Sequence, residues 1–279
     1  INIRWIDISQ KTLNELEKLR PSIYNFDLKY GSTVIYGNKD ICNQIPSIDS
    51  SFITLQDAEI LFFTRLYPFL GSVPFDGFNK EINKSQTMFF RNQMAKAILA
   101  IVDVILLQNK VYDSSYIKRN NIVKKIIKND SDMINLFDWA LTEKMYPKSS
   151  KFSKDQLKSF YKKIVRLYFN EMMKALSKLY ASDIRNTDDL VLAKKYSLKV
   201  WISKLKELII NKSLNHYNKQ FELNILQSYI AEYYLLEEKQ KILALKKIKI
   251  LLEKFNYKST SSMNNWDDIR LFVSDLRTY

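Results

Sequence analysis

The segment from residue 88 to residue 119, MFFRNQMAKAILAIVDVILLQNKVYDSSYIKR, limits the possible folds of this chain more than any other segment. Its apolar residues recur three and four positions apart, which predicts an α-helix. From Ala95 to Leu107 the helix is apolar on nearly every side, so we expect it to be buried among other helices. The residues that define this period are Met94, Ala97, Ile98, Ile101, Val102, Ile105 and Leu106.

Two charged residues, Lys96 and Asp103, interrupt this apolar helix. They are seven positions apart and therefore lie on roughly the same face. Burying a charge is costly unless it is paired, hydrogen-bonded or next to water, so this face is a candidate site. The alternative is that both charges lie at the edge of a helical bundle, with the lysine stem extended toward solvent. From spacing alone, the second interpretation is favoured.

Glycine and proline are scarce, with four Gly and five Pro among 279 residues, and nearly all of them precede residue 80. This composition argues against sandwiches, barrels and Rossmann folds, which need many turns or a glycine-rich loop. A mainly α fold is predicted instead, in which long helices form an antiparallel bundle. Helices are predicted over residues 54–66, 88–107, 117–128, 131–146, 153–180, 187–214, 222–255 and 264–276.

The first fifty residues have a different pattern. Ile1–Ser9 alternates apolar and polar residues, which predicts a strand, and a second strand is predicted over Asp27–Tyr36. Between them, Thr12 and Glu15 have the spacing of a capping box at the start of a short helix. We therefore expect a small α+β region that precedes the helical bundle. The predicted units are residues 1–50 and 51–279, with 51–147 and 148–279 as subdomains of the second.

The composition also limits the classes of function. Forty-four Lys and Arg against thirty Asp and Glu give a net charge of +14, which favours polyanionic partners such as nucleotides or nucleic acid. One cysteine, Cys42, excludes an internal disulfide and indicates a reducing compartment. One histidine, His216, excludes multi-histidine metal sites. Neither a signal peptide nor a bilayer-spanning stretch is visible, so a cytoplasmic location is expected.

Part of the chain resembles a known family. The resemblance is to stand-alone nucleotidyltransferases of the polymerase-β-like superfamily, which includes kanamycin nucleotidyltransferase, and it covers roughly residues 1 to 125. Residues 21–31, 34–40 and 45–46 resemble the end of that family's catalytic domain, and Thr64-Arg65 the end of the helix that follows. The matching positions in the helical half are Arg91, Lys96, Ala100, Asp103, Leu106, Leu107, Tyr112, Ser115, Tyr116 and Arg119.

The resemblance implies that a nucleotide binds between the two halves and that a nucleotidyl group passes to an acceptor. Tyr112, Tyr116 and Arg119 would then face the nucleotide together with Lys96 and Asp103. Tyrosine can stack on a base, and the planar arginine fork can hold a phosphate. The alternative is that the two tyrosines pack in the interior and that the basic residues after them form a solvated face.

The catalytic motif of this superfamily is a Gly-Ser turn followed by Asp-x-Asp on a strand, which holds Mg²⁺. No such motif is present, so the catalytic residues are unknown. Mg²⁺ is expected only if the motif lies upstream of Ile1, and otherwise no cofactor or resident metal is expected. Either the chain is truncated or the activity is absent. The alternative function is a non-catalytic basic helical module that binds nucleic acid or a protein partner, through 117–128 or the lysines of 239–254.

Overall fold

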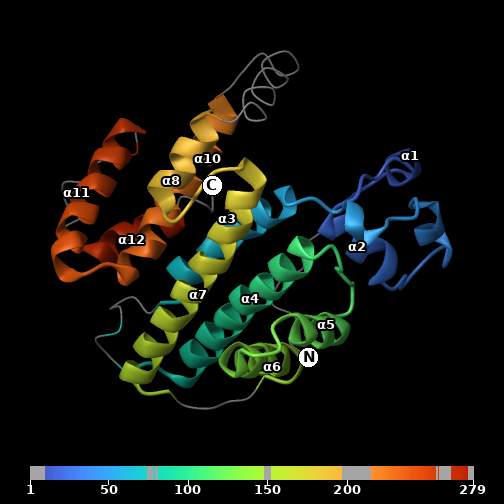
Figure 1. Ribbon diagram of the computed structural model, residues 1–279, viewed down its shortest axis with the longest axis horizontal. Coiled ribbons are helices and arrows are strands. Elements are labelled where there is room, and N and C mark those ends of the chain that lie inside the picture. Colours follow the sequence, from blue (N-terminus) through green and yellow to red (C-terminus); the bar gives the residue numbers. More distant parts are fainter. Residues whose placement is uncertain are drawn as a thin grey trace.

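The computed structural model describes residues 10–73, 78, 81–147, 152–196, 215–255, 257 and 265–275. This part of the chain is helical and contains no strand, which confirms the mainly α fold (Figure 1). The strand predicted over Ile1–Ser9 lies outside the described residues. The helices are α1 (Leu13–Leu16), α2 (Ile23–Tyr30), η1 (Ile41–Gln44), η2 (Ser50–Phe52), α3 (Gln56–Gly71), α4 (Lys84–Gln108), α5 (Tyr116–Ile126), α6 (Ser131–Met145), α7 (Lys154–Tyr180), α8 (Thr187–Tyr196), α10 (Asn215–Glu232), η3 (Tyr233–Leu235), α11 (Glu238–Lys254) and α12 (Trp266–Asp275).

Helix α4 lies at the centre of the bundle and packs against α3, α6 and α7 (Figure 1). Every residue from Met94 to Leu107 is buried except Lys96, which is half-buried. The burial expected from its apolar sequence is therefore confirmed. Helix α3 also packs against α7, α10 and α12.

Local sequence determines where the two longest helices begin. Asn83 caps α4 by accepting from the backbone N–H of Gln86, and the Gln86 side chain accepts from the backbone N–H of Asn83. Ser153 and Gln156 form the same reciprocal pair at the start of α7. Each box satisfies two backbone donors that the first turn leaves without a partner. Helix α4 consequently begins four residues before the predicted start at residue 88.

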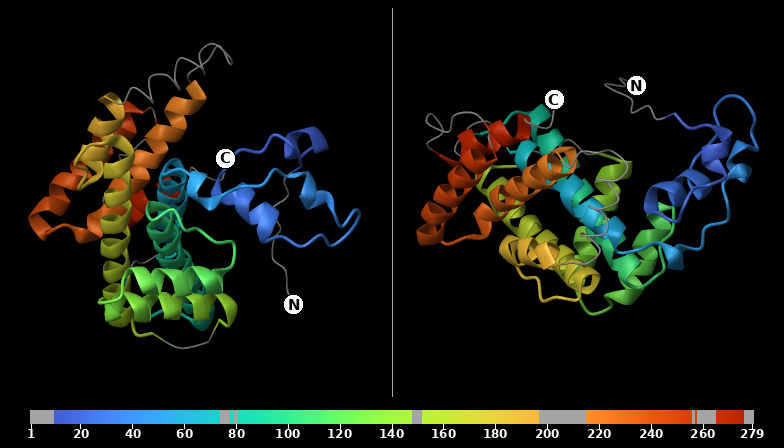
Figure 2. Two further views of the ribbon diagram at one scale, coloured as in Figure 1. Left: turned by 45° about the vertical axis from the view of Figure 1, so that its right-hand side comes forward. Right: turned by 90° about the horizontal axis from the view of Figure 1, so that it is seen from above.

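Residues 10–52 form an arm that projects from one end of the bundle (Figure 2). The strand predicted over Asp27–Tyr36 is wrong, because residues 23–30 form helix α2. Ser22 caps this helix through the backbone N–H of Asn25. Phe26 and Tyr30, one helical turn apart, bring their ring centroids within 4.7 Å. A cap and an i,i+4 aromatic pair stabilise a helix, so they prevail over the strand preference of the individual residues. The α+β character predicted for residues 1–50 is thus absent from residues 10–50.

Further predicted helix boundaries differ from the structure. Helix α3 does not end near Leu66 but continues through Pro68 to Gly71. The single helix predicted over residues 222–255 is two helices, because α10 ends at Glu232 and α11 begins at Glu238. The break lies where the ring of Tyr233 stacks on Trp266 of α12, at a centroid distance of 5.8 Å. The spacing of apolar residues along a helix does not predict such a contact between residues that are distant in sequence.

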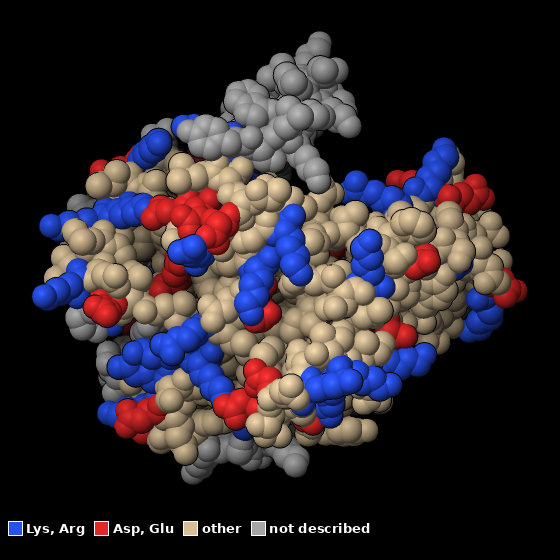
Figure 3. Space-filling model, in the orientation of Figure 1, with Lys and Arg blue, Asp and Glu red and all other residues tan. Residues whose placement is uncertain are grey.

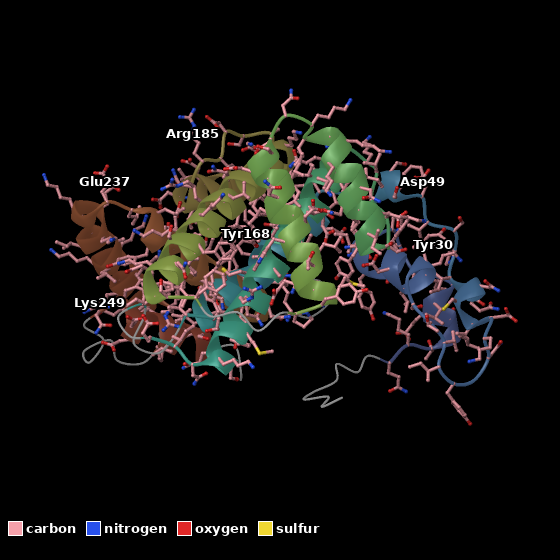
Figure 4. The ribbon with its side chains drawn as sticks, turned by 90° about the horizontal axis from the view of Figure 1, so that it is seen from below. Tyr30, Asp49, Tyr168, Arg185, Glu237 and Lys249 are labelled. Atoms are coloured by element: carbon pink, nitrogen blue, oxygen red, sulfur yellow. The ribbon has the colours of Figure 1, made fainter. Side chains whose placement is uncertain are left out.

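One hydrophobic cluster extends through the bundle from Ile53 in the chain before α3 to Val273 in α12. Tyr168 of α7 lies inside it, as Figure 4 shows, and donates its hydroxyl proton to the carbonyl of Phe62 at 2.6 Å. None of the described helices combines the length and apolarity that a membrane-spanning helix requires. The predicted boundaries at residues 50 and 147 stay predictions.

Candidate functional site

Arg119 connects three elements near the base of the arm. It lies in the first turn of α5, which Ser115 caps, and its side chain is almost fully buried. The guanidinium donates to Asp103 of α4 at 2.8 Å and to Asp27 of α2 at 3.1 Å. It also donates to the backbone carbonyls of Asp113 and Ser114, at 2.6 and 3.0 Å. The planar fork of this arginine is thus bound to protein groups on both edges.

Two tyrosine rings lie against the same guanidinium. The ring centroids of Tyr112 and Tyr116 each lie 4.5 Å from the central carbon of Arg119. The hydroxyl of Tyr112 donates to Asp27 at 3.0 Å, so the tyrosine and the arginine share one carboxylate. Burial raises the pKa of Tyr116 above its ordinary value, because the charged phenolate would be removed from water.

Four of the five predicted site residues, Asp103, Tyr112, Tyr116 and Arg119, therefore meet in one cluster. Together with Asp27, these four residues are called the Arg119 cluster. Burial raises the pKa of Asp103 and of Asp27, and the positive charge of Arg119 opposes that shift. Asp27 was not among the predicted site residues, although it lies in the segment that carries the resemblance. The carboxylate of Asp103 bonds Arg119 and not Lys96, the other charged residue on its face of α4.

Lys96 lies on the same helix as Asp103 but is surrounded by other positive charges. Its pKa is lowered, first by burial and then by the nearby charges of Lys144 on α6 and Arg65 on α3. The Nε atom of Arg65 is buried and has no hydrogen-bond partner among the described residues. The amine of Lys144 lies 6.0 Å from the ring centroid of Tyr116, which places this cationic group beside the Arg119 cluster.

Sequence reasoning did not identify Arg65 and Lys144 as site residues. Arg65 was only part of a matching dipeptide, and Lys144 occupies the last turn of α6, where a lysine usually stabilises the helix dipole. No sequence signal links these two residues, because the packing of α3 and α6 on α4 brings them together. The cationic group that they form with Lys96 is called the α3–α4–α6 cations below.

The cluster does not have the ligands of a Mg²⁺ site. Asp27 and Asp103 lie on either side of the Arg119 guanidinium, which already supplies the positive charge that both carboxylates need. A divalent cation there would be placed against that guanidinium. Among the described residues, no three His, Cys, Asp or Glu side chains are close enough to hold a metal ion.

The lysine-rich helix α11 lies at the end of the molecule opposite the arm, as the positions of Lys249 and Tyr30 in Figure 4 show. Lys247 pairs with Asp188 of α8, whereas Lys246 is exposed. Figure 3 shows Lys and Arg interspersed with Asp and Glu over the face that it presents. This is the distribution of a solvated surface rather than of one concentrated basic patch.

Comparison with known proteins adds no relative. No protein-family model matches the chain, and neither a curated protein nor a solved structure is significantly similar to it.

Proposed function

We propose that this chain is a nucleotidyltransferase-like protein that binds a nucleotide where the arm meets the helical bundle. The observation that carries the proposal is the Arg119 cluster, in which Asp27 of the arm is bonded to Tyr112, in the turn between α4 and α5, and to Arg119 of α5. The α3–α4–α6 cations lie beside it. Aromatic rings next to unneutralised cations suit a ligand that has both a base and phosphates.

The residues have different roles in this proposal. Lys96 supplies positive charge for a phosphate, and Tyr116 supplies an aromatic ring, which lies 6.0 Å from the amine of Lys144. Most N–H groups of Arg119 are already bound to protein groups, one of them to Asp103. In this proposal Arg119 and Asp103 therefore hold the Tyr116 ring in place and do not themselves bind the nucleotide. The catalytic carboxylates, the acceptor and the metal are not assigned to any described residue.

Calorimetric titration of ATP, GTP, CTP and UTP into residues 1–279 tests the proposal. We expect at least one nucleotide to bind, and Lys96→Met to weaken that binding by about 1.5–3 kcal/mol, the typical contribution of a hydrogen bond to a charged group. Joint replacement of Lys246 and Lys247 is the control. It should change binding little, because Lys246 is exposed and screened at physiological salt and Lys247 is already paired with Asp188. Arg119 is unsuitable for this test, because its removal affects the fold.

Loss of binding in the control but not in Lys96→Met would overturn the proposal and favour a module that binds nucleic acid or protein through α11. A transfer assay complements the titration. We expect no transfer of a labelled nucleotide by residues 1–279 in Mg²⁺ or Mn²⁺, because the carboxylate pair is missing from the sequence. Label transfer that a chelator abolishes would show that other carboxylates perform the reaction.

A further inference from the structure

Helix α11 exposes more apolar surface than any other described helix. The side chains of Ile242, Leu243 and Ile250 are 62%, 67% and 63% exposed. Each of the other described helices exposes more than half of at most one large apolar side chain. Single apolar residues on a surface are ordinary, whereas three that are this exposed on one helix indicate a surface for an apolar contact.

These three side chains lie on the side of α11 that is turned away from the core. The opposite side is formed by Ile248 and Leu252, which are fully buried in the shared hydrophobic cluster. Ile250 follows Ile248 by two positions, which is about 200° around an α-helix, and Ile242 and Leu243 lie about two turns before Ile250. Helix α11 packs chiefly against α10 and lies at the outer edge of the bundle (Figure 1). No other described element covers its outer face.

Lysines surround the exposed apolar side chains. Two lysines of α11 have protein partners, because Lys241 lies 5.7 Å from the ring centroid of Tyr233 and Lys247 pairs with Asp188. Glu253 is the one acid among the described side chains of the outer face, so this face is positively charged. The other lysines of the helix form no ion pair with a described residue, and they are Lys239, Lys246, Lys249 and Lys254.

The combination of aliphatic side chains and lysines indicates the chemistry of the partner. Protein interfaces are enriched in aromatic residues and arginine and depleted in lysine, which is the reverse of this face. A nucleic acid is bound through its phosphates and by aromatic stacking, and here it would place phosphates against isoleucine and leucine. A negatively charged lipid surface fits both kinds of residue. Aliphatic side chains enter the boundary between headgroups and acyl chains, while long lysine stems keep the amines at the level of the headgroups.

We propose that α11 binds an anionic membrane surface, with its axis in the plane of the membrane and Ile242, Leu243 and Ile250 inserted between the lipids. The lysines of the outer face attract the negatively charged headgroups. The inference does not depend on the proposed function, because α11 lies at the end of the molecule away from the arm, as Lys249 and Tyr30 in Figure 4 show. The membrane and the nucleotide would therefore occupy different ends of the chain.

Flotation of the full chain with lipid vesicles tests the inference. Vesicles of phosphatidylcholine and phosphatidylserine in equal parts should bind the chain. Vesicles of phosphatidylcholine alone should bind it at least about tenfold more weakly, because each lysine near an anionic surface contributes a factor of about five. Added salt should weaken the binding to the mixed vesicles, since it screens surface charges.

Two double variants separate the apolar contribution from the charged one. Ile242→Gln with Ile250→Gln should weaken binding to the mixed vesicles by about tenfold or more, because the inserted apolar surface is lost. Lys246→Gln with Lys254→Gln should weaken it by about 25-fold, the product of two factors of about five. The four residues are exposed and glutamine is a good helix former, so both variants should keep the fold.

The chain offers matched controls for both variants. Ile60→Gln with Ile117→Gln replaces isoleucines that are 59% and 56% exposed on α3 and α5. Lys125→Gln with Lys128→Gln removes two exposed lysines at the end of α5. Both control pairs should leave vesicle binding unchanged, because their residues lie on other helices than α11.

A polarity-sensitive fluorescent label provides a second readout. Attached through Leu243→Cys in a chain that also carries Cys42→Ser, it should shift its emission to shorter wavelength on the mixed vesicles, because it enters an apolar environment. The same label on Cys42 of the unsubstituted chain should show no shift, because this single cysteine lies in the arm.

The other results overturn the inference. Absence of binding to the mixed vesicles does so, as does binding that the control pairs weaken as much as the α11 pairs. Binding of a labelled oligonucleotide that depends on the lysine pair but not on the isoleucine pair, without vesicle binding, assigns α11 to nucleic acid. A dimer that the isoleucine pair dissociates in analytical ultracentrifugation, without vesicle binding, assigns it to a contact between two copies of the chain.

Discussion

Arg119 attaches the arm to the bundle through its guanidinium group. It bonds Asp27 on α2 and Asp103 on α4, and lies between the rings of Tyr112 and Tyr116. The contact is supported by Asp57 of α3, whose carboxylate accepts from the backbone N–H of Ile23 at 3.1 Å. Asp57 lies in the first turn of α3, and this contact secures the start of α2.

Arg119→Ala should lower the free energy of unfolding by about 3–5 kcal/mol, the usual cost of removing one partner from a buried ion pair. The physical reason is that Asp103 would stay buried without a compensating charge. Urea denaturation measures the change. Lys118→Ala, at the exposed neighbouring position, should stay within about 0.5 kcal/mol of the unsubstituted chain. Comparable effects of both substitutions would show that the cluster contributes little to stability.

Arg119 stabilises the fold, whereas the positive charge of Lys96 destabilises it. Its pKa is lowered in the folded chain, so the folded state binds fewer protons than the unfolded state between the two pKa values. Stability therefore rises with pH through that interval, and the full cost of the charge is present below it. Lys96→Met should accordingly stabilise the fold at pH 7, by about 0.5–1 kcal/mol.

The gain from Lys96→Met should shrink as pH rises toward about 10.4, the ordinary pKa of lysine, because the unsubstituted chain then loses the same charge. Thermal unfolding at a series of pH values measures both effects. A gain that does not depend on pH would assign the stabilisation to packing rather than to charge.

Among the elements, α4 depends on a cap that lies entirely within its own sequence. Asn83 accepts from the backbone N–H of Gln86 at 2.9 Å, and the amide oxygen of Gln86 accepts from Asn83 at 3.0 Å. Because α4 contacts α3, α6 and α7, fraying of its first turn also loosens the neighbouring helices.

Asn83→Ala should lower the free energy of unfolding by about 1 kcal/mol, the typical value for loss of a side-chain cap. Ser85→Ala is the control, because Ser85 is an exposed residue in the same turn and its side chain makes no capping bond. Equal losses in the two variants would mean that helix propensity, and not the cap, determines stability at this end of α4.

At the scale of the whole molecule, the bundle has one continuous core. Helix α10, late in the chain, packs against α3, and the shared cluster includes the fully buried Leu226 of α10. The arm contributes only partly buried residues to it, such as Ile23 and Phe26. We therefore expect the bundle to unfold as one unit, with the arm opening at a lower free energy.

Leu226→Ala should reduce the opening free energy of slowly exchanging amides in α4 and α10 by the same amount, about 2–5 kcal/mol. Native-state hydrogen exchange measures both helices in one experiment. A reduction confined to α10 would show that the helices after residue 147 form a separate subdomain, as the predicted boundary implies.

The sequence by itself determined the features that depend on neighbouring residues. The capping boxes at Thr12, which precedes α1, and at Ser153 follow from side chains three positions apart, and both are present. The burial of α4 follows from apolar residues on all of its sides, because such a helix can be stable only inside a bundle. Each of these features depends on residues that are only one or two helical turns apart. Periodicity and residue type are therefore sufficient to predict it.

Only the tertiary structure decided which distant groups meet. Asp103 has Lys96 seven positions before it and Arg119 sixteen positions after it, and the turn between α4 and α5 determines that Arg119 is its partner. Asp27 reaches the same guanidinium because residues 23–30 are a helix and not the predicted strand. Arg65 and Lys144 approach Lys96 because α3 and α6 pack on α4. Charges act through space rather than along the chain, so the cationic group beside the Arg119 cluster exists only once these helices are packed.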